Sequence, residues 1–252
     1  PSEVKQYALA HNLPVLQPVK MKDPDFLAEL ESYHADLQVV VAFRMLPEVV
    51  WSMPRFGTFN VHAALLPQYR GAAPINWAVI NGETETGVTT FFLDKDIDTG
   101  RIILSKTFAI PDDANVEYVY DGLMALGADA AVETVDAMLQ GNGEVPSMDQ
   151  APLAEGTELK PAPKIFKETC QIAWNQPAKR VYDFVRGLSP YPGSWTTLAP
   201  SDAVLKVYGA AKTGEATQEA PGTISVSGHR LLVATADEWL ELKEVQMAGK
   251  KR

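Results

Sequence analysis

Hydrophobic residues in the first part of the chain follow two alternating patterns. Short apolar runs rich in β-branched residues are typical of buried strands, and apolar residues recurring every three or four positions are typical of amphipathic helices. The strands predicted in this way cover residues 13–18, 37–43, 58–67, 86–94 and 100–110. The predicted helices cover residues 24–34, 46–53, 73–82 and 116–140. This βαβ alternation predicts an open, mostly parallel sheet with helices on both faces.

The pattern changes after Gly143. Residues 144–164 contain four prolines and little periodicity, which predicts a linker. Beyond the linker, short strands predominate, with one helix predicted over residues 177–188 near the start. That texture indicates a small β-barrel or sandwich with one helix. We therefore expect two units, residues 1–143 and residues 165–252.

Composition places the chain among ordinary globular proteins. Its 252 residues are 46% hydrophobic and 21% charged, which permits a sizeable core. No apolar run approaches the roughly 20 residues of a membrane span, and the first residues show no signal-peptide pattern. The single cysteine, Cys170, excludes a disulfide framework, indicates a reducing cytosol and is expected to be a plain buried thiol.

Charge is unevenly distributed along the chain, although the net charge of −10 argues against indiscriminate nucleic-acid binding. Residues 1–159 hold 9 Lys and Arg against 23 Asp and Glu, whereas residues 160–252 hold 13 against 9. A mildly basic C-terminal part is compatible with a phosphate-bearing partner. Ordinary variation between domains explains the asymmetry equally well.

Two polar residues stand at the end of a predicted buried strand. Asn60 and His62 are two positions apart, so both side chains point to the same face. The strand of residues 86–94 likewise runs into three acidic residues, Asp94, Asp96 and Asp98. In open α/β sheets, sites gather at such strand ends, where a carboxylate can orient an imidazole and an amide can stabilise an oxyanion. The alternative is a core Asn and His that are satisfied by backbone groups.

The polar residues form a set suited to acyl transfer without a covalent intermediate. No serine or cysteine is placed as a nucleophile, and the sequence has no Gly-rich dinucleotide fingerprint and no metal-ligand spacing. We therefore expect no metal. The other histidines, His11, His34 and His229, are expected to be structural or exposed.

Two stretches of the sequence, NVHAALLPQYRGAAPINW at 60–77 and ETGVTTFFLDKDIDTG at 85–100, strongly resemble the 10-formyltetrahydrofolate-dependent formyltransferases. KIFKETCQIAW and RGLSPYPGSW resemble landmarks of that family's C-terminal domain. The resemblance implies a Rossmann-like catalytic domain over residues 1–143 and an OB-like, tRNA-binding β-barrel over residues 165–252. It also implies formyl transfer from 10-formyltetrahydrofolate to the α-amine of initiator methionyl-tRNA, by a cytoplasmic, monomeric enzyme.

The resemblance assigns roles by position. Asn60 matches the residue that steadies the oxyanion, His62 the one that handles the amine proton, and Asp98 the one that holds the histidine and a water. Two loops match the folate-binding segments of the family, and their residues are Arg44, Met45, Leu46, Asp94, Lys95, Asp96 and Ile97. Arg70 and Gly71 match a loop near the tRNA acceptor end.

The chain departs from the family pattern at two places. Ala64 replaces the usual serine before L-L-P, so a hydroxyl hydrogen bond from that position is absent. The family's first strand–helix–strand, with its G-T-P-x-F motif, has no counterpart, so we expect the sequence to omit an N-terminal segment.

Other functions stay open at this point. One alternative is a formyltransferase acting on a nucleotide-linked amino sugar or on glycinamide ribonucleotide. A second is a hydrolase that releases formate with the same Asn, His and Asp. A third, non-enzymatic alternative is an inactive or binding-only fragment.

Overall fold

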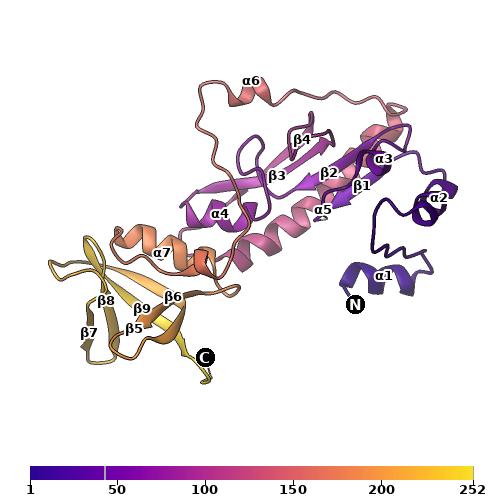
Figure 1. Ribbon diagram of the computed structural model, residues 1–252. Coiled ribbons are helices and arrows are strands. Elements are labelled where there is room, and N and C mark those ends of the chain that lie inside the picture. The colour runs from indigo at the N-terminus through magenta and orange to yellow at the C-terminus, as the bar shows by residue number, and fades with distance from the viewer. Residues whose placement is uncertain (43, 252) are drawn as a thin grey trace.

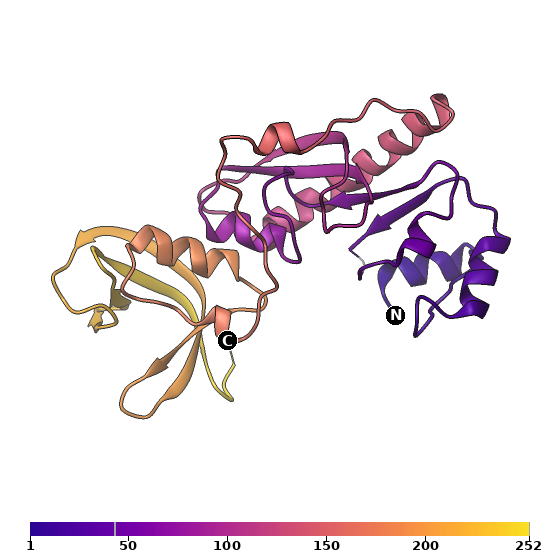
Figure 2. The ribbon, with the colours of Figure 1, turned by 45° about the horizontal axis from the view of Figure 1, so that its top comes forward.

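The computed structural model describes residues 1–42 and 44–251. Phe43, predicted to end a strand, and Arg252, predicted to end the C-terminal unit, lie outside the described residues. An α/β part and a β-rich part lie at different ends of an elongated molecule, with the N-terminal helices farthest from the β-rich part (Figures 1 and 2). Among the described residues, no helix has the length and apolar character needed to cross a membrane.

The first sheet has four strands in the order β1-β2-β3-β4. These strands are β1 (Gln38–Val41), β2 (Thr58–His62), β3 (Glu85–Phe92) and β4 (Ile102–Ala109). The α/β class is confirmed, but only β1 and β2 pair in parallel, and β3 is antiparallel to both of its neighbours. The described sheet is therefore mixed rather than mostly parallel. A short connection joins β3 to β4, and a short connection between paired strands requires an antiparallel hairpin.

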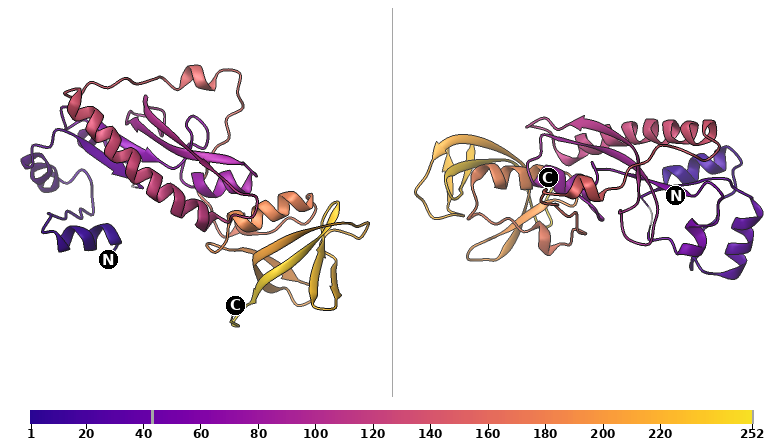
Figure 3. Two further views of the ribbon diagram at one scale, coloured as in Figure 1. Left: turned by 180° about the vertical axis from the view of Figure 1, so that it is seen from behind. Right: turned by 90° about the horizontal axis from the view of Figure 1, so that it is seen from above.

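Helix α5 (Val116–Gln140) runs along one face of this sheet, as the view from behind shows (Figure 3). Its start is fixed by Asn115, whose side-chain oxygen accepts the Tyr118 N–H at 3.0 Å. Buried residues of α5 such as Val119 and Leu123 join Val88 of β3 in the main core. The short helix α4 (Pro74–Ile80) follows β2 and contributes to the same core.

The N-terminal part contains α1 (Glu3–Ala10), α2 (Pro24–Ser32) and the single-turn α3 (Glu48–Trp51). The prediction of a strand over residues 13–18 is wrong, because this segment is an irregular connection. Pro14 and Pro18 lack the N–H groups that a strand ladder needs, so an apolar run alone does not produce a strand there.

The second sheet is antiparallel, with five strands in the order β5-β6-β9-β8-β7. These strands are β5 (Ser194–Leu198), β6 (Ala203–Ala216), β7 (Ile224–Ser227), β8 (Arg230–Ala234) and β9 (Glu238–Met247). Helix α7 (Ala178–Gly187) packs Val181 and Val185 against this sheet. The 3₁₀ turn η1 (Glu168–Cys170) precedes this helix, and Gln171, which follows the turn, forms an isolated bridge with Trp195. Cys170 is a buried free thiol.

Residues 144–164, predicted as a linker, run back along the α/β part and carry one short helix, α6 (Ala151–Ala154) (Figure 1). Met148 and Ile102 exchange two backbone hydrogen bonds of 2.9 and 2.8 Å. Farther on, Ala162 N–H donates to the Arg70 carbonyl at 2.9 Å. The segment is therefore fixed to strand β4 near its start and to the turn after β2 near its end.

The two parts of the molecule meet where α4 packs against α7. The Asn76 side chain donates to the Gly187 carbonyl at 2.9 Å. Arg186 reaches from α7 to the Ala114 carbonyl, just before α5, at 2.8 Å. These contacts fix the β-rich part against the α/β part through buried polar groups.

Candidate active site

His62 occupies the carboxyl end of β2, the strand between β1 and β3, and is 6% exposed. Its Nε2 lies 2.8 Å from the Tyr69 carbonyl oxygen. A carbonyl can only accept, so Nε2 carries a hydrogen and the neutral ring has its lone pair on Nδ1. The structure therefore assigns Nδ1 as the basic nitrogen of His62.

Asp98 faces that nitrogen from the turn between β3 and β4. Its Oδ2 lies 3.8 Å from His62 Nδ1, and the two side chains are only 7% and 11% exposed. The same oxygen accepts the Gly71 N–H at 2.9 Å, which fixes the carboxylate. Two acceptor atoms thus face each other when the imidazole is neutral, so a proton arriving at Nδ1 gains a close carboxylate partner. The pair is suited to act as a general base.

Asn60 lies on the same strand, paired opposite Phe91 of β3. Its Oδ1 is buried and has no hydrogen-bond partner among the described residues. Buried polar atoms without a partner are rare, and one beside a His–Asp pair is typical of a site that awaits a ligand. The amide can offer Oδ1 to an amine and Nδ2–H to a developing oxyanion.

The turn after β2 is fixed from inside by Thr89 of β3. Its hydroxyl donates to the Ala64 carbonyl at 2.7 Å and accepts the Leu66 N–H at 3.1 Å. Ala64 itself is fully buried in the main core. The hydroxyl that the sequence lacks at position 64 is therefore not needed to hold this turn, because a neighbouring strand supplies one.

The same turn is fixed from outside by the 158–162 segment. Tyr69 N–H donates to the Lys160 carbonyl at 2.7 Å, and Lys160 Nζ lies 2.6 Å from Glu83 Oε1, which also accepts from the Tyr69 hydroxyl. Burial and the hydrogen bond to Glu83 raise the pKa of Tyr69 well above its ordinary range. Burial by itself raises the pKa of Glu83, but hydrogen bonds from Lys160 and Tyr69 outweigh it and leave that pKa below its usual value.

Gly71 is required by this packing. Its φ of +126° lies in the region that favours glycine, and a Cβ there would lie 2.5 Å from the Ala162 carbonyl oxygen. Its N–H is the one that donates to Asp98. A side chain at this position would therefore disturb both the linker contact and the carboxylate.

Arg70 points toward the linker. Its Nε and Nη2 lie 3.1 and 2.7 Å from Gln150 Oε1. Gln150 is 3% exposed and also donates to the carbonyls of Asp98 and Gly100. Sequence reasoning missed Gln150, because a glutamine in a proline-rich stretch carries no local signal of burial.

The residues predicted to bind folate lie on two loops. Arg44 Nη2 donates to the Pro18 carbonyl at 2.9 Å, whereas Met45 is 71% exposed and Leu46 is half-buried. In the second loop, Asp94 Oδ1 accepts from the Asp96 N–H at 3.0 Å. Asp94, Lys95, Asp96 and Ile97 are all exposed. Each loop thus has one exposed apolar side chain, Met45 in the first and Ile97 in the second.

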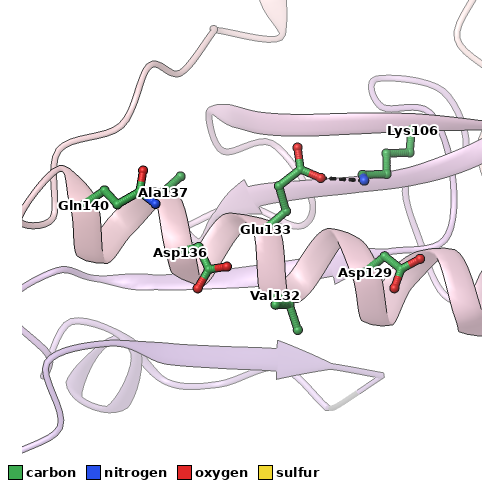
Figure 4. Close-up of a pocket in the computed structure, with 7 residues that line it drawn as sticks. All are labelled: Lys106, Asp129, Val132, Glu133, Asp136, Ala137 and Gln140. Carbon is green, nitrogen blue, oxygen red and sulfur yellow. Dashed lines mark ion pairs between the residues drawn. The ribbon is translucent and has the colours of Figure 1, made fainter.

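Two hollows on the surface do not contain the His–Asp pair. One, of about 530 Å³, lies along the charged face of α5, where Lys106 Nζ pairs with Glu133 at 2.5 Å (Figure 4). The other, of about 670 Å³, is lined by Val15, Leu16, Gln17, Pro18, Val19, Lys20, Asp23, Asp25, Phe26 and Glu29. Within residues 1–42 and 44–251, His, Cys, Asp and Glu side chains form no group of three that could hold a metal ion.

Comparisons with known proteins agree on one family. Residues 1–135 match the formyl transferase family, and residues 164–252 match the formyl transferase C-terminal domain. The methionyl-tRNA formyltransferase of Bacteroides fragilis is 57% identical over 255 residues, which cover 100% of this chain and 78% of that protein.

Two solved structures share the fold at lower identity. HypX from Aquifex aeolicus in complex with tetrahydrofolic acid has a TM-score of 0.64 at 21% identity, covering 90% of this chain and 39% of that one. WlaRD, a sugar 3N-formyl transferase in the presence of dTDP and 5-N-formyl-THF, has a TM-score of 0.70 at 16% identity, covering 98% and 82%.

Proposed function

This chain belongs to the methionyl-tRNA formyltransferase family, and we propose on that premise that it transfers the formyl group of 10-formyltetrahydrofolate to the α-amine of initiator methionyl-tRNA. The observation that supports this function most directly is the His62–Asp98 pair, with His62 on the same strand as Asn60, whose buried Oδ1 has no hydrogen-bond partner within the described residues. This set supplies a base, its counter-charge and an amide at one strand end.

We assign the steps to these three residues. Asn60 orients the amine through Oδ1 and stabilises the oxyanion at the formyl carbon through Nδ2–H. His62 accepts the amine proton on Nδ1 as the new C–N bond forms, and returns it to the folate nitrogen as the old C–N bond breaks. Asp98 stabilises the transient imidazolium across the 3.8 Å gap, directly or through a water.

The binding roles are part of the same proposal. The backbone of Arg44, Met45 and Leu46 reads the pterin ring, and the Asp94–Ile97 loop closes the other side of that pocket. Arg70 and Gly71 lie beside the path of the tRNA acceptor end. Residues 165–252, which we infer to form an OB-like barrel, bind the body of the tRNA, consistent with the 13 Lys and Arg against 9 Asp and Glu over residues 160–252.

We further propose a cytoplasmic enzyme that works as a monomer. A single buried free thiol suits a reducing compartment. Both proposed binding elements are carried by one chain, so no second copy is needed to complete the site. Light scattering of the purified protein with and without tRNA measures the oligomeric state, and a stable dimer contradicts the monomer.

The function is tested by formylation of methionyl-tRNA with the full-chain protein. We expect His62→Ala to lower kcat by about 10²–10⁴-fold and Asn60→Ala by about 10²–10³-fold. His229→Ala, in the exposed β7–β8 hairpin, is the matched control and should leave kcat unchanged. Full activity of His62→Ala overturns the mechanism, and formylation of an amino-sugar nucleotide in place of methionyl-tRNA overturns the substrate.

A further inference from the structure

We propose that Gln150, a buried residue of the segment between the two domains, is a positioning residue for formyl transfer that holds the turn carrying Asp98. The inference rests on the proposed function, because it takes Asp98 to be the partner of the catalytic His62. It adds a residue outside both strand-end motifs, from a stretch whose sequence predicts only a linker.

All hydrogen-bonding capacity of the Gln150 amide is used. Nε2 donates to the carbonyls of Asp98 and Gly100 at 2.9 and 2.8 Å, and Oε1 accepts from Arg70 Nε and Nη2 at 3.1 and 2.7 Å. A side-chain amide has two N–H donors and two lone pairs, so this site satisfies all four. A buried amide so fully engaged defines one geometry for the groups around it.

The Asp98 turn needs such a partner. Asp98 has φ +57°, in the left-handed region that non-glycine residues rarely adopt. Gln150 binds the carbonyls on both sides of Thr99, while the Asp98 carboxylate accepts from Gly71. Different parts of the chain therefore fix the backbone and the side chain of Asp98: Gln150 binds its backbone carbonyl, and Gly71 binds its carboxylate.

Arg70 closes the arrangement into a ring. Its side chain binds Gln150, Gln150 binds the Asp98 carbonyl, the Asp98 carboxylate binds Gly71, and Gly71 follows Arg70 in sequence. A displacement of Arg70 therefore reaches Asp98 by two routes. If the tRNA acceptor end contacts this turn, its arrival acts directly on the position of the carboxylate.

The position of Gln150 is itself fixed by its neighbours. Two residues earlier, Met148 pairs with Ile102. Asp149, next to Gln150, forms an exposed ion pair of 2.7 Å with Arg101. Asp149 thus shares the segment and the local fold of Gln150 without contacting Asp98, which makes it the matched control.

Two substitutions separate the halves of the Gln150 contact. Gln150→Glu keeps an oxygen that can accept from Arg70, but it replaces the Nε2 donor with an oxygen that faces the carbonyls of Asp98 and Gly100. Gln150→Leu has a similar size and removes both the contact with Arg70 and the contact with the two carbonyls. We expect each to lower kcat about 10- to 100-fold, because small displacements of catalytic groups are costly. For Gln150→Glu, which keeps the acceptors for Arg70, the KM for methionyl-tRNA should stay within about threefold, since uniform binding is not removed. Asp149→Asn should change neither.

A second readout distinguishes positioning from general stabilisation. If Gln150 acts through the Asp98–His62 pair, Gln150→Glu in a His62→Ala background should cause little further loss of kcat. If Gln150 has only a structural role, the fold losses in kcat of Gln150→Glu and His62→Ala should multiply in the double variant. Amide hydrogen exchange at residues 98–101 should accelerate in Gln150→Leu but not in Asp149→Asn, and this measurement does not depend on turnover.

The outcomes separate the two proposals. Wild-type kcat in both Gln150 variants, multiplying losses with His62→Ala, or unchanged exchange at residues 98–101 would each overturn the role of Gln150. If the wild-type protein instead fails to formylate methionyl-tRNA, the proposed function fails. The exchange experiment then still decides whether Gln150 holds the turn.

Discussion

Asp183 and Arg186 form a buried ion pair at the junction of the two domains, and removing the carboxylate should be costly. Asp183 is 2% exposed, and its side chain accepts from Arg186 Nε at 2.8 Å and from Lys179 Nζ at 2.7 Å. Asp183→Ala leaves the Arg186 guanidinium buried without its counter-charge. The perturbation therefore tests a packed electrostatic contact rather than a surface one.

The magnitude follows from what remains around Arg186. Breaking a buried pair by removing one partner costs about 3–5 kcal/mol. Arg186 keeps the carbonyls of Ala114 at 2.8 Å and Pro111 at 3.3 Å as acceptors, which offsets part of the loss. We therefore expect Asp183→Ala to lower the free energy of unfolding by about 3 kcal/mol, at the lower end of that range.

Equilibrium urea unfolding followed by circular dichroism measures this difference. Lys179→Ala is the control, because Lys179 is 47% exposed and its pair with Asp183 should contribute only about 0–1 kcal/mol. A loss below about 1 kcal/mol for Asp183→Ala, or a loss equal to that of Lys179→Ala, refutes the reasoning. A double variant with leucine at both 183 and 186 should recover part of the stability, since apolar replacement removes the unpaired charge.

Three further predictions concern other contacts of the same fold. Gly71→Ala should lower the free energy of unfolding in urea by about 1–3 kcal/mol and should also lower kcat. Gly156→Ala is the control: Gly156 has φ +70° and open space around it, so this variant tests backbone strain alone and should leave kcat unchanged. Asp237 accepts the first N–H of α7 at 2.8 Å, so Asp237→Ala should cost about 1 kcal/mol in thermal or urea unfolding, and an unchanged midpoint contradicts the cap. The folded-state pKa of Glu83 is lowered, so its contribution to stability is present above the ordinary carboxyl pKa and is lost as pH falls through the folded value. Glu83→Gln should therefore lose less unfolding free energy than the unchanged protein as pH falls below the ordinary carboxyl pKa, and identical pH curves for the two proteins contradict this.

Elements whose signals are local could be predicted from the sequence. Helix α5 is one of them, because its apolar periodicity predicts a helix over residues 116–140 and the structure has the same bounds. The strand that carries Asn60 and His62 was also predicted, but it ends at His62 rather than at residue 67.

Features that depend on distant partners could not be predicted. The run 13–18 is apolar enough for a strand, but Pro14 and Pro18 cannot complete a ladder. The direction of β3 against β2 depends on how the chain returns after α4, which no residue pattern encodes. The buried Gln150 side chain is held by hydrogen bonds to residues 70, 98 and 100, which are far from it in sequence. The sequence around Gln150 therefore could not predict the role that we propose for it.

The linker also bears on the chemistry of His62 by a second path. The backbone N–H of Tyr69 donates to the Lys160 carbonyl at 2.7 Å, and the Tyr69 carbonyl accepts from His62 Nε2–H at 2.8 Å. The carbonyl that fixes the imidazole tautomer is thus held in place by the segment leading to the C-terminal domain. Since Nδ1 is basic only while Nε2 keeps its hydrogen, docking of residues 158–162 would also support the base role that we propose for His62. The same segment therefore contacts the Asp98 backbone through Gln150 and, through Lys160, holds the Tyr69 backbone that bonds His62.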